Sequence, residues 1–343
     1  MSDRENLAKE ASIHLTTSKL SAANRWDHFL ARLGVNRMGH RIEPGLFQLG
    51  NPTPESPIFV TANYTLSFDA LRSSLTGIDA YILVLDTKGV NVWCAAGEGT
   101  FGTDELVKRI EAANLQNVVS QRKLILPQLG APGVAAHVVK QRSGFKVEYG
   151  PVRATDLPKY LNDHQATPEM RRVQFTLADR LVLVPVEVTQ VMLPYLVVLA
   201  ILAGLFSWVR ASLNYGLAAA ILAILLSGVV LFPILLPWLP TRDFSSKGFI
   251  LGGLTSLPFI FNTLIHNNAV SWWRLTGGGL VYLLTIPPAV AFIALNFTGS
   301  TTYTSRSGVR REIFTYIPIM AWMFGIGVVL WIVLSLIKLF GGV

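Results

Sequence analysis

Asn91-Val92-Trp93-Cys94-Ala95-Ala96-Gly97 is the stretch on which the interpretation of this chain depends, because it holds the only cysteine among 343 residues. A single sulfur cannot form an intrachain disulfide, a zinc cage or an iron–sulfur cluster, since each of these needs two to four such ligands. One thiolate can act as a nucleophile or as a single soft ligand to a metal that a cofactor carries. A lone cysteine also often serves as a small buried hydrophobic residue. The Ala and Gly residues after Cys94 favour a ligand, because they let a flat group approach the sulfur closely.

Around this stretch, apolar runs alternate with helical segments in the manner of an α/β domain. The pattern predicts strands at 58–62, 81–85, 123–126 and 145–149, and a last β-rich run at 181–186. It predicts helices at 22–33, 68–74, 134–141 and 156–161, and another that begins at Thr103. The cysteine stretch is expected to be a loop between the strand at 81–85 and the helix from Thr103.

Loops at the carboxyl ends of the strands are where open parallel sheets bind their ligands. Four segments rich in small or polar residues fall at such positions, although each one alone is also compatible with an ordinary turn. Together they predict a broad platform for a large rigid ligand. The residues expected to bind it are Thr61, Asn63, Asn91, Val92, Trp93, Cys94, Ala95, Ala96, Gly97, Gln128, Gly130, Ala131, Gly133, Gly150 and Val152.

The second half of the chain predicts a membrane domain. A helix needs about 20 apolar residues to cross a bilayer core of about 30 Å, and the segments 192–209, 215–239, 249–265, 280–297 and 313–339 meet or approach that length. Apart from His266 at the end of the third segment, no ionisable residue lies in the middle of a span, which argues against a transporter. The expected domains are an N-terminal extension at 1–50, a soluble α/β domain at 51–187 and an all-α transmembrane domain of about five helices at 188–343.

The net charge of +8 is concentrated in the predicted membrane domain, where only Asp243 and Glu312 are acidic. A nucleic-acid footprint would instead need clustered Lys and Arg with aromatic residues on a soluble face. Five basic residues lie in the second and fourth loops and three on the opposite side, so the positive-inside rule places the soluble domain in the cytoplasm. The charged N-terminus predicts no secretory signal. We therefore expect a multi-pass protein of the inner (cytoplasmic) membrane.

The cysteine stretch also resembles the signature of the mercury-methylating corrinoid proteins, the HgcA family, and more distantly the corrinoid iron–sulfur protein of acetyl-CoA synthesis. Further similar stretches are Phe-Val-Thr-Ala-Asn-Tyr at 59–64, Leu-Pro-Gln-Leu-Gly-Ala-Pro-Gly at 126–133 and Gly-Pro-Val-Arg-Ala at 150–154. The resemblance covers nearly the whole chain. One position departs from it, because the family pattern usually continues with Lys where this chain has Glu98.

This resemblance implies a Rossmann-like corrinoid-binding domain that holds a corrinoid with its lower base detached and Cys94 as the axial thiolate ligand to cobalt. It implies a methyltransferase that moves a methyl group from cobalt to Hg(II), with the methyl leaving as a carbanion equivalent, although radical transfer stays open. The implied partners are a ferredoxin-like two-cluster iron–sulfur protein (HgcB), a methyltetrahydrofolate-dependent methyl donor system and membrane lipid, with no nucleic acid. Two alternatives stay open: a corrinoid methyl carrier of one-carbon and acetyl-CoA metabolism, and a transporter with a cytosolic sensor domain.

Overall fold

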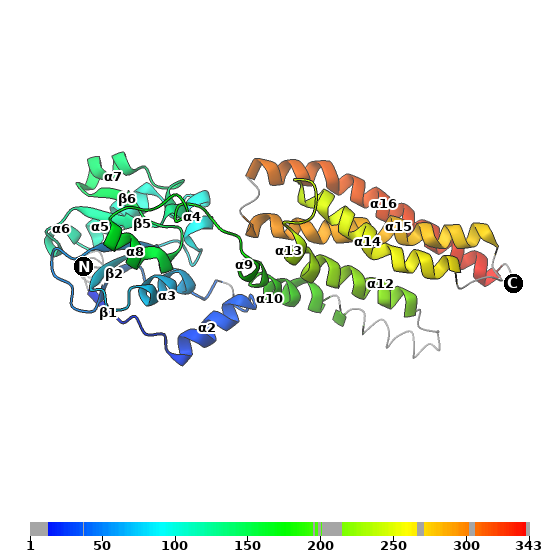
Figure 1. Cartoon of the computed structure of the whole chain (residues 1–343), viewed down its shortest axis with the longest axis horizontal. Coiled ribbons are helices and arrows are strands. Elements are labelled where there is room, and N and C mark those ends of the chain that lie inside the picture. The colour runs from blue at the N-terminus through cyan, green and yellow to red at the C-terminus, as the bar shows by residue number, and fades with distance from the viewer. Residues whose placement is uncertain are drawn as a thin grey trace, which may run out of the picture. The chain divides into compact units, whose positions relative to one another are not determined.

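The computed structural model describes residues 13–36, 38–194, 196, 197, 200, 215–265, 271–301 and 306–340. The chain forms two compact units, of which the first ends at Gln174 and the second begins at Phe175 (Figure 1). The first unit is a mixed α/β domain and the second is helical throughout its described part. The predicted combination of an α/β domain with a helical membrane-type domain is confirmed at this level.

The first unit contains one six-stranded sheet in the order β1-β2-β4-β3-β5-β6. Its strands are β1 (Ile13–Thr16), β2 (Gly45–Leu49), β3 (Ile58–Ala62), β4 (Ala80–Leu85), β5 (Lys123–Leu126) and β6 (Lys146–Tyr149). The last four are mutually parallel, whereas β2 runs antiparallel to β4 and β1 runs parallel to β2. The sheet thus takes two reversed strands from residues that the sequence analysis placed in an extension ahead of the domain.

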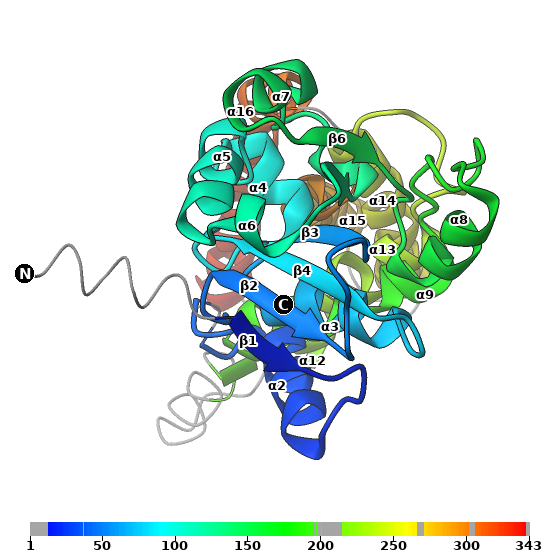
Figure 2. The same cartoon turned by 90° about the vertical axis from the view of Figure 1, so that its left-hand side faces the viewer.

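Helices cover both faces of this sheet, as Figure 2 shows. The described helices of the first unit are α2 (Ala22–Arg32), α3 (Thr65–Ser74), α4 (Val92–Glu98), α5 (Thr103–Ala112), α6 (Leu115–Val118), α7 (Ala136–Ser143) and α8 (Leu157–Asp163). Helices α4 to α7 share one hydrophobic cluster with the sheet, and α3 and α8 share the cluster on the other face. Most of the predicted helices are confirmed to within a few residues, but the cysteine stretch is a helix, α4, where a loop was expected.

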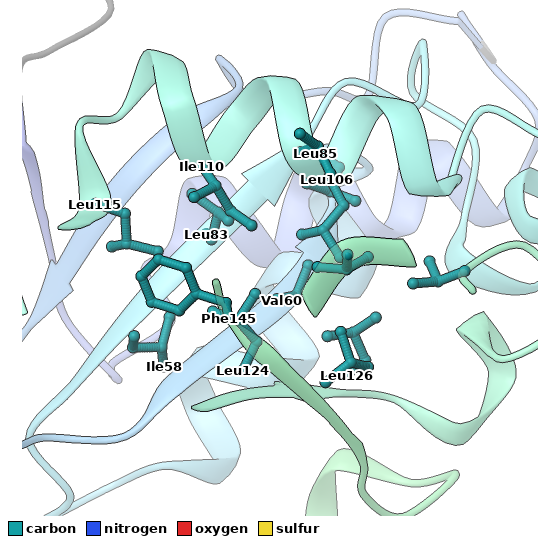
Figure 3. Close-up of a cluster of buried hydrophobic side chains, with 14 of the residues drawn as sticks. Ile58, Val60, Leu83, Leu85, Leu106, Ile110, Leu115, Leu124, Leu126 and Phe145 are labelled. Carbon is teal, nitrogen blue, oxygen red and sulfur yellow. The ribbon is translucent and has the colours of Figure 1, made fainter. Parts of the chain in front are cut away.

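The two clusters follow from the alternation of side chains along the central strands. Ile58, Val60 and Ala62 of β3 face the cluster under α5, while Phe59 between them faces the cluster under α3. Figure 3 shows the first cluster, where Leu106 and Ile110 of α5 pack on strand residues such as Leu83. Because every residue of β3 and β4 is buried, both strands lie in the middle of the domain and bring their carboxyl ends to one edge.

The second unit consists of helices that run side by side (Figure 1). Its described helices are α9 (Leu177–Leu181), α10 (Val184–Glu187), α12 (Tyr215–Leu225), α13 (Phe232–Leu235), α14 (Phe244–Ile265), α15 (Trp272–Leu295) and α16 (Arg306–Phe340). The strand predicted at 181–186 is wrong, because these residues form α9, α10 and the turn between them. Leu183 packs against other helices there rather than on a sheet edge, whereas Leu181 and Val182 are exposed.

Four described helices are long and apolar enough to cross a membrane: Gly216–Leu235, Phe244–Ile265, Trp272–Thr298 and Ser307–Ile337. They correspond to the last four predicted spans, although three of them begin several residues earlier than the hydropathy pattern indicated. The first predicted span, 192–209, lies largely outside the described residues. Prolines 258, 287, 288 and 318 lie inside these helices, where neighbouring helices can compensate for the lost backbone hydrogen bonds.

A buried carboxylate joins two of these spans. Glu312 on α16 is only 4% exposed and accepts hydrogen bonds from the backbone N–H and the hydroxyl of Ser245, at 3.0 Å and 3.1 Å. Ser245 is in the first turn of α14, so the carboxylate satisfies a backbone donor that a helix start leaves unpaired. Close by in the sequence, the hydroxyl of Tyr316 donates to Asp243 at 3.0 Å. The starts of α14 and α16 are therefore held together by polar contacts.

Candidate functional site

The carboxyl ends of β3, β4, β5 and β6 form one edge of the sheet, and a cavity of about 360 Å³ opens there. The cavity lies where β3 and β5 diverge into helices on opposite faces, which is the position at which open α/β sheets bind ligands. Its walls are mainly apolar, with Thr61, Ser67 and Asn91 as polar side chains. It is lined by Phe59, Val60, Thr61, Ser67, Ala70, Leu71, Asn91, Val92, Trp93, Ile125, Leu126, Pro127, Leu129, Pro151, Val152, Ala154 and Leu157.

Helix α4 presents Cys94 beside this cavity. Asn91 is its N-cap, and the Asn91 side chain accepts a hydrogen bond from the backbone N–H of Cys94 at 3.0 Å. Gly99 ends the helix in the left-handed conformation at φ 91°, which favours glycine. Val92, Ala95 and Ala96 are buried against the sheet, whereas Gly97 and Glu98 are exposed and Cys94 is half-buried. The cysteine is thus on a rigid first helical turn with one side toward solvent.

Small residues let α4 pack closely on the loop after β5. A Cβ atom on Gly133 would lie 2.1 Å from the carbonyl oxygen of Phe101 and 3.1 Å from the Cα of Ala96, and one on Gly130 would lie 2.5 Å from the Phe101 ring. By contrast, a Cβ on Gly97 or Gly99 would meet nothing within 4 Å. Gly130 and Gly133 are therefore needed for packing beneath α4, and the outer side of α4 is open.

Asn63 connects the end of β3 to the loop that leads into α4. Its side-chain oxygen accepts hydrogen bonds from the backbone N–H and hydroxyl of Thr87, at 3.1 Å and 2.9 Å, and from the N–H of Gly89 at 2.9 Å. Its amide donates to Asp86 at 3.3 Å. Asn63 is 2% exposed and Thr87 is fully buried. In this structure, Asn63 holds the loop before Cys94 in place.

A buried histidine fixes the next segment along the same edge. His40 is 4% exposed, and its ring nitrogens lie 2.8 Å from a carboxylate oxygen of Asp27 and 2.6 Å from the Val35 carbonyl oxygen. Both partners are acceptors, so the imidazolium form satisfies both contacts. Burial alone would lower the pKa of His40, but the hydrogen bonds to Asp27 and Val35 outweigh it and raise the pKa. Asp27 also accepts from the hydroxyl of Thr65 at the start of α3.

The structure brings all fifteen predicted site residues to this edge, in different roles. Thr61, Asn91, Val92, Trp93 and Val152 line the cavity, whereas Cys94 lies outside its lining on α4. The Gln128 side chain accepts a hydrogen bond from Arg171 at 2.9 Å, and the backbone N–H of Gly150 donates to Leu126 at 2.8 Å. Ala131 is half-buried in the loop between Gly130 and Gly133.

Sequence reasoning missed the part of the cavity that α3 contributes. Ser67, Ala70 and Leu71 belong to its first turns, directly after β3. The signal was available, since a helix that starts immediately after a central parallel strand places its N-terminal residues at the ligand edge. No sequence signal pointed to the contact between His40 and Asp27.

The first unit is thus an α/β domain with a cavity at the carboxyl edge of a parallel sheet core. Residues 36–161 match the model of the CdhD family, described as CO dehydrogenase/acetyl-CoA synthase delta subunit. The chain is 33% identical over 114 residues to the acetyl-CoA decarbonylase/synthase complex subunit gamma of Archaeoglobus fulgidus. It is 27% identical over 129 residues to the corrinoid/iron-sulfur protein large subunit of Moorella thermoacetica.

These matches cover only part of each protein. They span 33% and 37% of this chain, and 24% and 28% of the Archaeoglobus and Moorella proteins. The similarity lies in the first unit and supports a likeness to corrinoid proteins of acetyl-CoA metabolism. The narrower resemblance to mercury-methylating proteins stays a prediction.

Proposed function

We propose that the first unit binds a corrinoid at the carboxyl edge of β3 to β6, and that the protein acts as a corrinoid-dependent methyltransferase. The observation that carries the proposal is the cavity at this edge beside a half-buried Cys94, within the segment that is similar to a corrinoid/iron-sulfur protein. A bound corrinoid supplies a cobalt centre that carries and releases a methyl group.

The Cys94 sulfur and the shape of the carboxyl edge of the sheet fit a bound corrinoid. The outer side of α4 is free of bulk at Gly97 and Gly99, so a broad flat group can approach Cys94 there. The cavity of about 360 Å³ is at the lower end of the range for drug-sized ligands. A corrinoid is much larger, so the cavity would hold only a side arm of the cofactor. Thr61, Trp93 and Val152 would bind that arm. With its lower base detached, the corrinoid would be free to take Cys94 as a ligand to cobalt.

Cys94 is the residue we propose as the metal ligand. An anionic sulfur is a soft, strongly donating ligand, so Cys94 would hold the metal and would add electron density to it. The hydrogen bond from its N–H to Asn91 and the burial of Ala95 and Ala96 fix the helical turn that carries it. Asn63, Gly130 and Gly133 position that turn from below. In this proposal they act through packing and hydrogen bonds rather than through contact with the cofactor.

Transfer of methyl groups in one-carbon and acetyl-CoA metabolism is the reaction that the matched relatives favour. Hg(II) is a second candidate acceptor, favoured by the motif around Cys94 and by the exposure of that face of α4. We propose a ferredoxin-like iron–sulfur protein and a methyltetrahydrofolate-dependent donor system as partners, since the single cysteine of these 343 residues cannot hold a cluster. The four apolar helices would hold the protein in the cytoplasmic membrane, with the first unit inside.

Reconstitution of the full chain with cobalamin under reducing conditions tests the proposal. We expect about one corrinoid per chain and a visible spectrum with the lower base detached; a colourless protein would contradict the proposal. Cys94→Ala should retain much of the corrinoid and lose methyl transfer, and Cys94→His should stay weakly active. Thr76→Ala, an exposed change after α3, is the matched control.

The acceptor is tested by supplying the methylated protein with Hg(II) and measuring methylmercury. Formation of methylmercury that depends on Cys94 supports Hg(II) as an acceptor. Methyl transfer only to a thiol or to an acetyl-CoA synthase would support the one-carbon role alone.

A further inference from the structure

A cavity of about 660 Å³ lies in the second unit. Residues of α12, α15 and α16 line it, together with Thr263 of α14. A second cavity of about 470 Å³ shares Ile221, Ile224 and Phe324 with it, so the two are neighbours along the same groove. A groove of this size between apolar helices leaves room for an occupant.

The two ends of this groove differ in chemistry. The described residues that line the second cavity are all apolar, among them Leu225, Phe292 and Met320. The first cavity adds Arg274, Tyr282, Thr285 and Ser335 to apolar walls. From Arg274 to Ile293 the groove follows α15 for about 28 Å at 1.5 Å per residue, which is close to the thickness of a bilayer core. The groove thus has one polar, cationic end and a long apolar remainder.

Among the described residues that line the two cavities, Arg274 is the only charged one. Its Nε atom is buried and has no hydrogen-bond partner among the described residues. Its guanidinium lies 5.2 Å from the centre of the Trp273 ring, which leaves its N–H groups available to an acceptor. Thr285 and Ser335 already donate to carbonyl groups of their own helices. A buried guanidinium N–H without an acceptor is costly, so an anionic acceptor from outside the protein fits this position.

We propose that this groove binds one phospholipid, with its phosphate at Arg274 and an acyl chain along the apolar walls of α12, α15 and α16. The position agrees with the start of a predicted span, where arginine and tryptophan side chains meet the head groups of a bilayer. The guanidinium fork suits a phosphate, and the apolar walls suit a hydrocarbon chain but not a soluble anion. This site is independent of the corrinoid proposed for the first unit.

Native mass spectrometry of the full chain in a phosphate-free detergent tests the proposal. The probes are palmitoyl-oleoyl phosphatidylglycerol and the matching diacylglycerol, which has the same chains without the phosphate. We expect saturable binding of about one phosphatidylglycerol per chain, and at least fivefold weaker binding of diacylglycerol. Arg274→Gln should remove this difference and Arg274→Lys should keep part of it. Arg310→Gln, at the opposite end of α16, is the control and should bind like the parent.

A second variant tests the tail part of the groove without touching the charge. Ala321 lines the apolar cavity, and Ala321→Phe should fill it and weaken phosphatidylglycerol binding severalfold while leaving the fold of the first unit unchanged. Equal binding by the parent, Arg274→Gln and Ala321→Phe would overturn the proposal. A parent protein that binds no phosphatidylglycerol would also overturn it, since the groove would then be filled by another part of the chain.

Discussion

Replacement of Asn63 by alanine tests whether this buried side chain holds the cysteine helix in place. The change removes the acceptor for two buried backbone N–H groups, those of Thr87 and Gly89. The Thr87 hydroxyl keeps the Val90 carbonyl as an acceptor, so it adds little to the loss. Each buried donor left without a partner costs about 1–3 kcal/mol. We expect the free energy of unfolding of the first unit to fall by about 3 kcal/mol.

The assay is urea unfolding of residues 1–174 followed by far-UV circular dichroism. With a slope of about 2 kcal/mol per M, a loss of about 3 kcal/mol lowers the midpoint by about 1.5 M. Asn63→Asp keeps the acceptor but brings a second carboxylate to Asp86, so its midpoint should lie between those of Asn63→Ala and the parent. Asn117→Ala, an exposed asparagine on α6, is the matched control and should shift the midpoint by less than about 0.3 M.

The same variants test whether Asn63 acts on corrinoid binding only by positioning the loop before Cys94. If it does, Asn63→Asp should recover corrinoid affinity in proportion to its free energy of unfolding. A midpoint for Asn63→Ala equal to that of the parent would refute the reasoning, because the two backbone donors would then have found other partners at no cost.

Three further outcomes are expected. Because the pKa of His40 is raised in the fold, its contribution to stability is full below about pH 6.5 and is lost as the pH rises through the folded pKa. His40→Gln should remove the His40 contribution to the difference between the urea midpoints at pH 6 and pH 9. An unchanged difference would contradict the raised pKa. Gly133→Ala should destabilise the first unit by about 2 kcal/mol in the same assay, whereas Gly97→Ala should be neutral or stabilising, and equal effects would be inconsistent with the close packing under α4. Glu98→Lys should speed corrinoid loading severalfold, since residue 98 is one helical turn from Cys94; loading at the parent rate would mean that Glu98 has no electrostatic role.

Strands β3, β4 and β5 of the parallel core could be predicted because each is a short, mainly apolar run between turn residues. The segments 58–62 and 123–126 match β3 and β5 to the residue, since every residue of β3 and the last three residues of β5 are buried and turn residues flank both strands. The reversed strands β1 and β2 were missed for the opposite reason. They are short, half-exposed in part and rich in polar neighbours, so their place in the sheet depends on the pairing of β2 with β4 and of β1 with β2 rather than on their own pattern.

The cysteine stretch was expected to be a loop because its small residues were interpreted only as allowing a ligand to approach Cys94. The same residues carry a helix signature: Asn91 as an N-cap, two alanines in the middle and Gly99 after the end. The strand predicted at 181–186 failed in a related way, because a short β-branched run cannot be told from a buried helix by periodicity alone. Contacts between distant segments, such as His40 with Asp27, depend on the tertiary fold and leave no local signal.

The contact between Glu312 and Ser245 has a consequence for biogenesis. A carboxylate that enters a membrane domain without a partner costs several kcal/mol, and Glu312 finds its partner 67 positions earlier in the chain. Because α14 precedes α16 in the chain, it is synthesised first, and the N–H of Ser245 lacks the Glu312 acceptor until α16 has been made. If α16 entered the lipid without α14, the Glu312 carboxylate would be in lipid without a hydrogen-bond donor. The two helices are therefore expected to leave the insertion machinery as a pair.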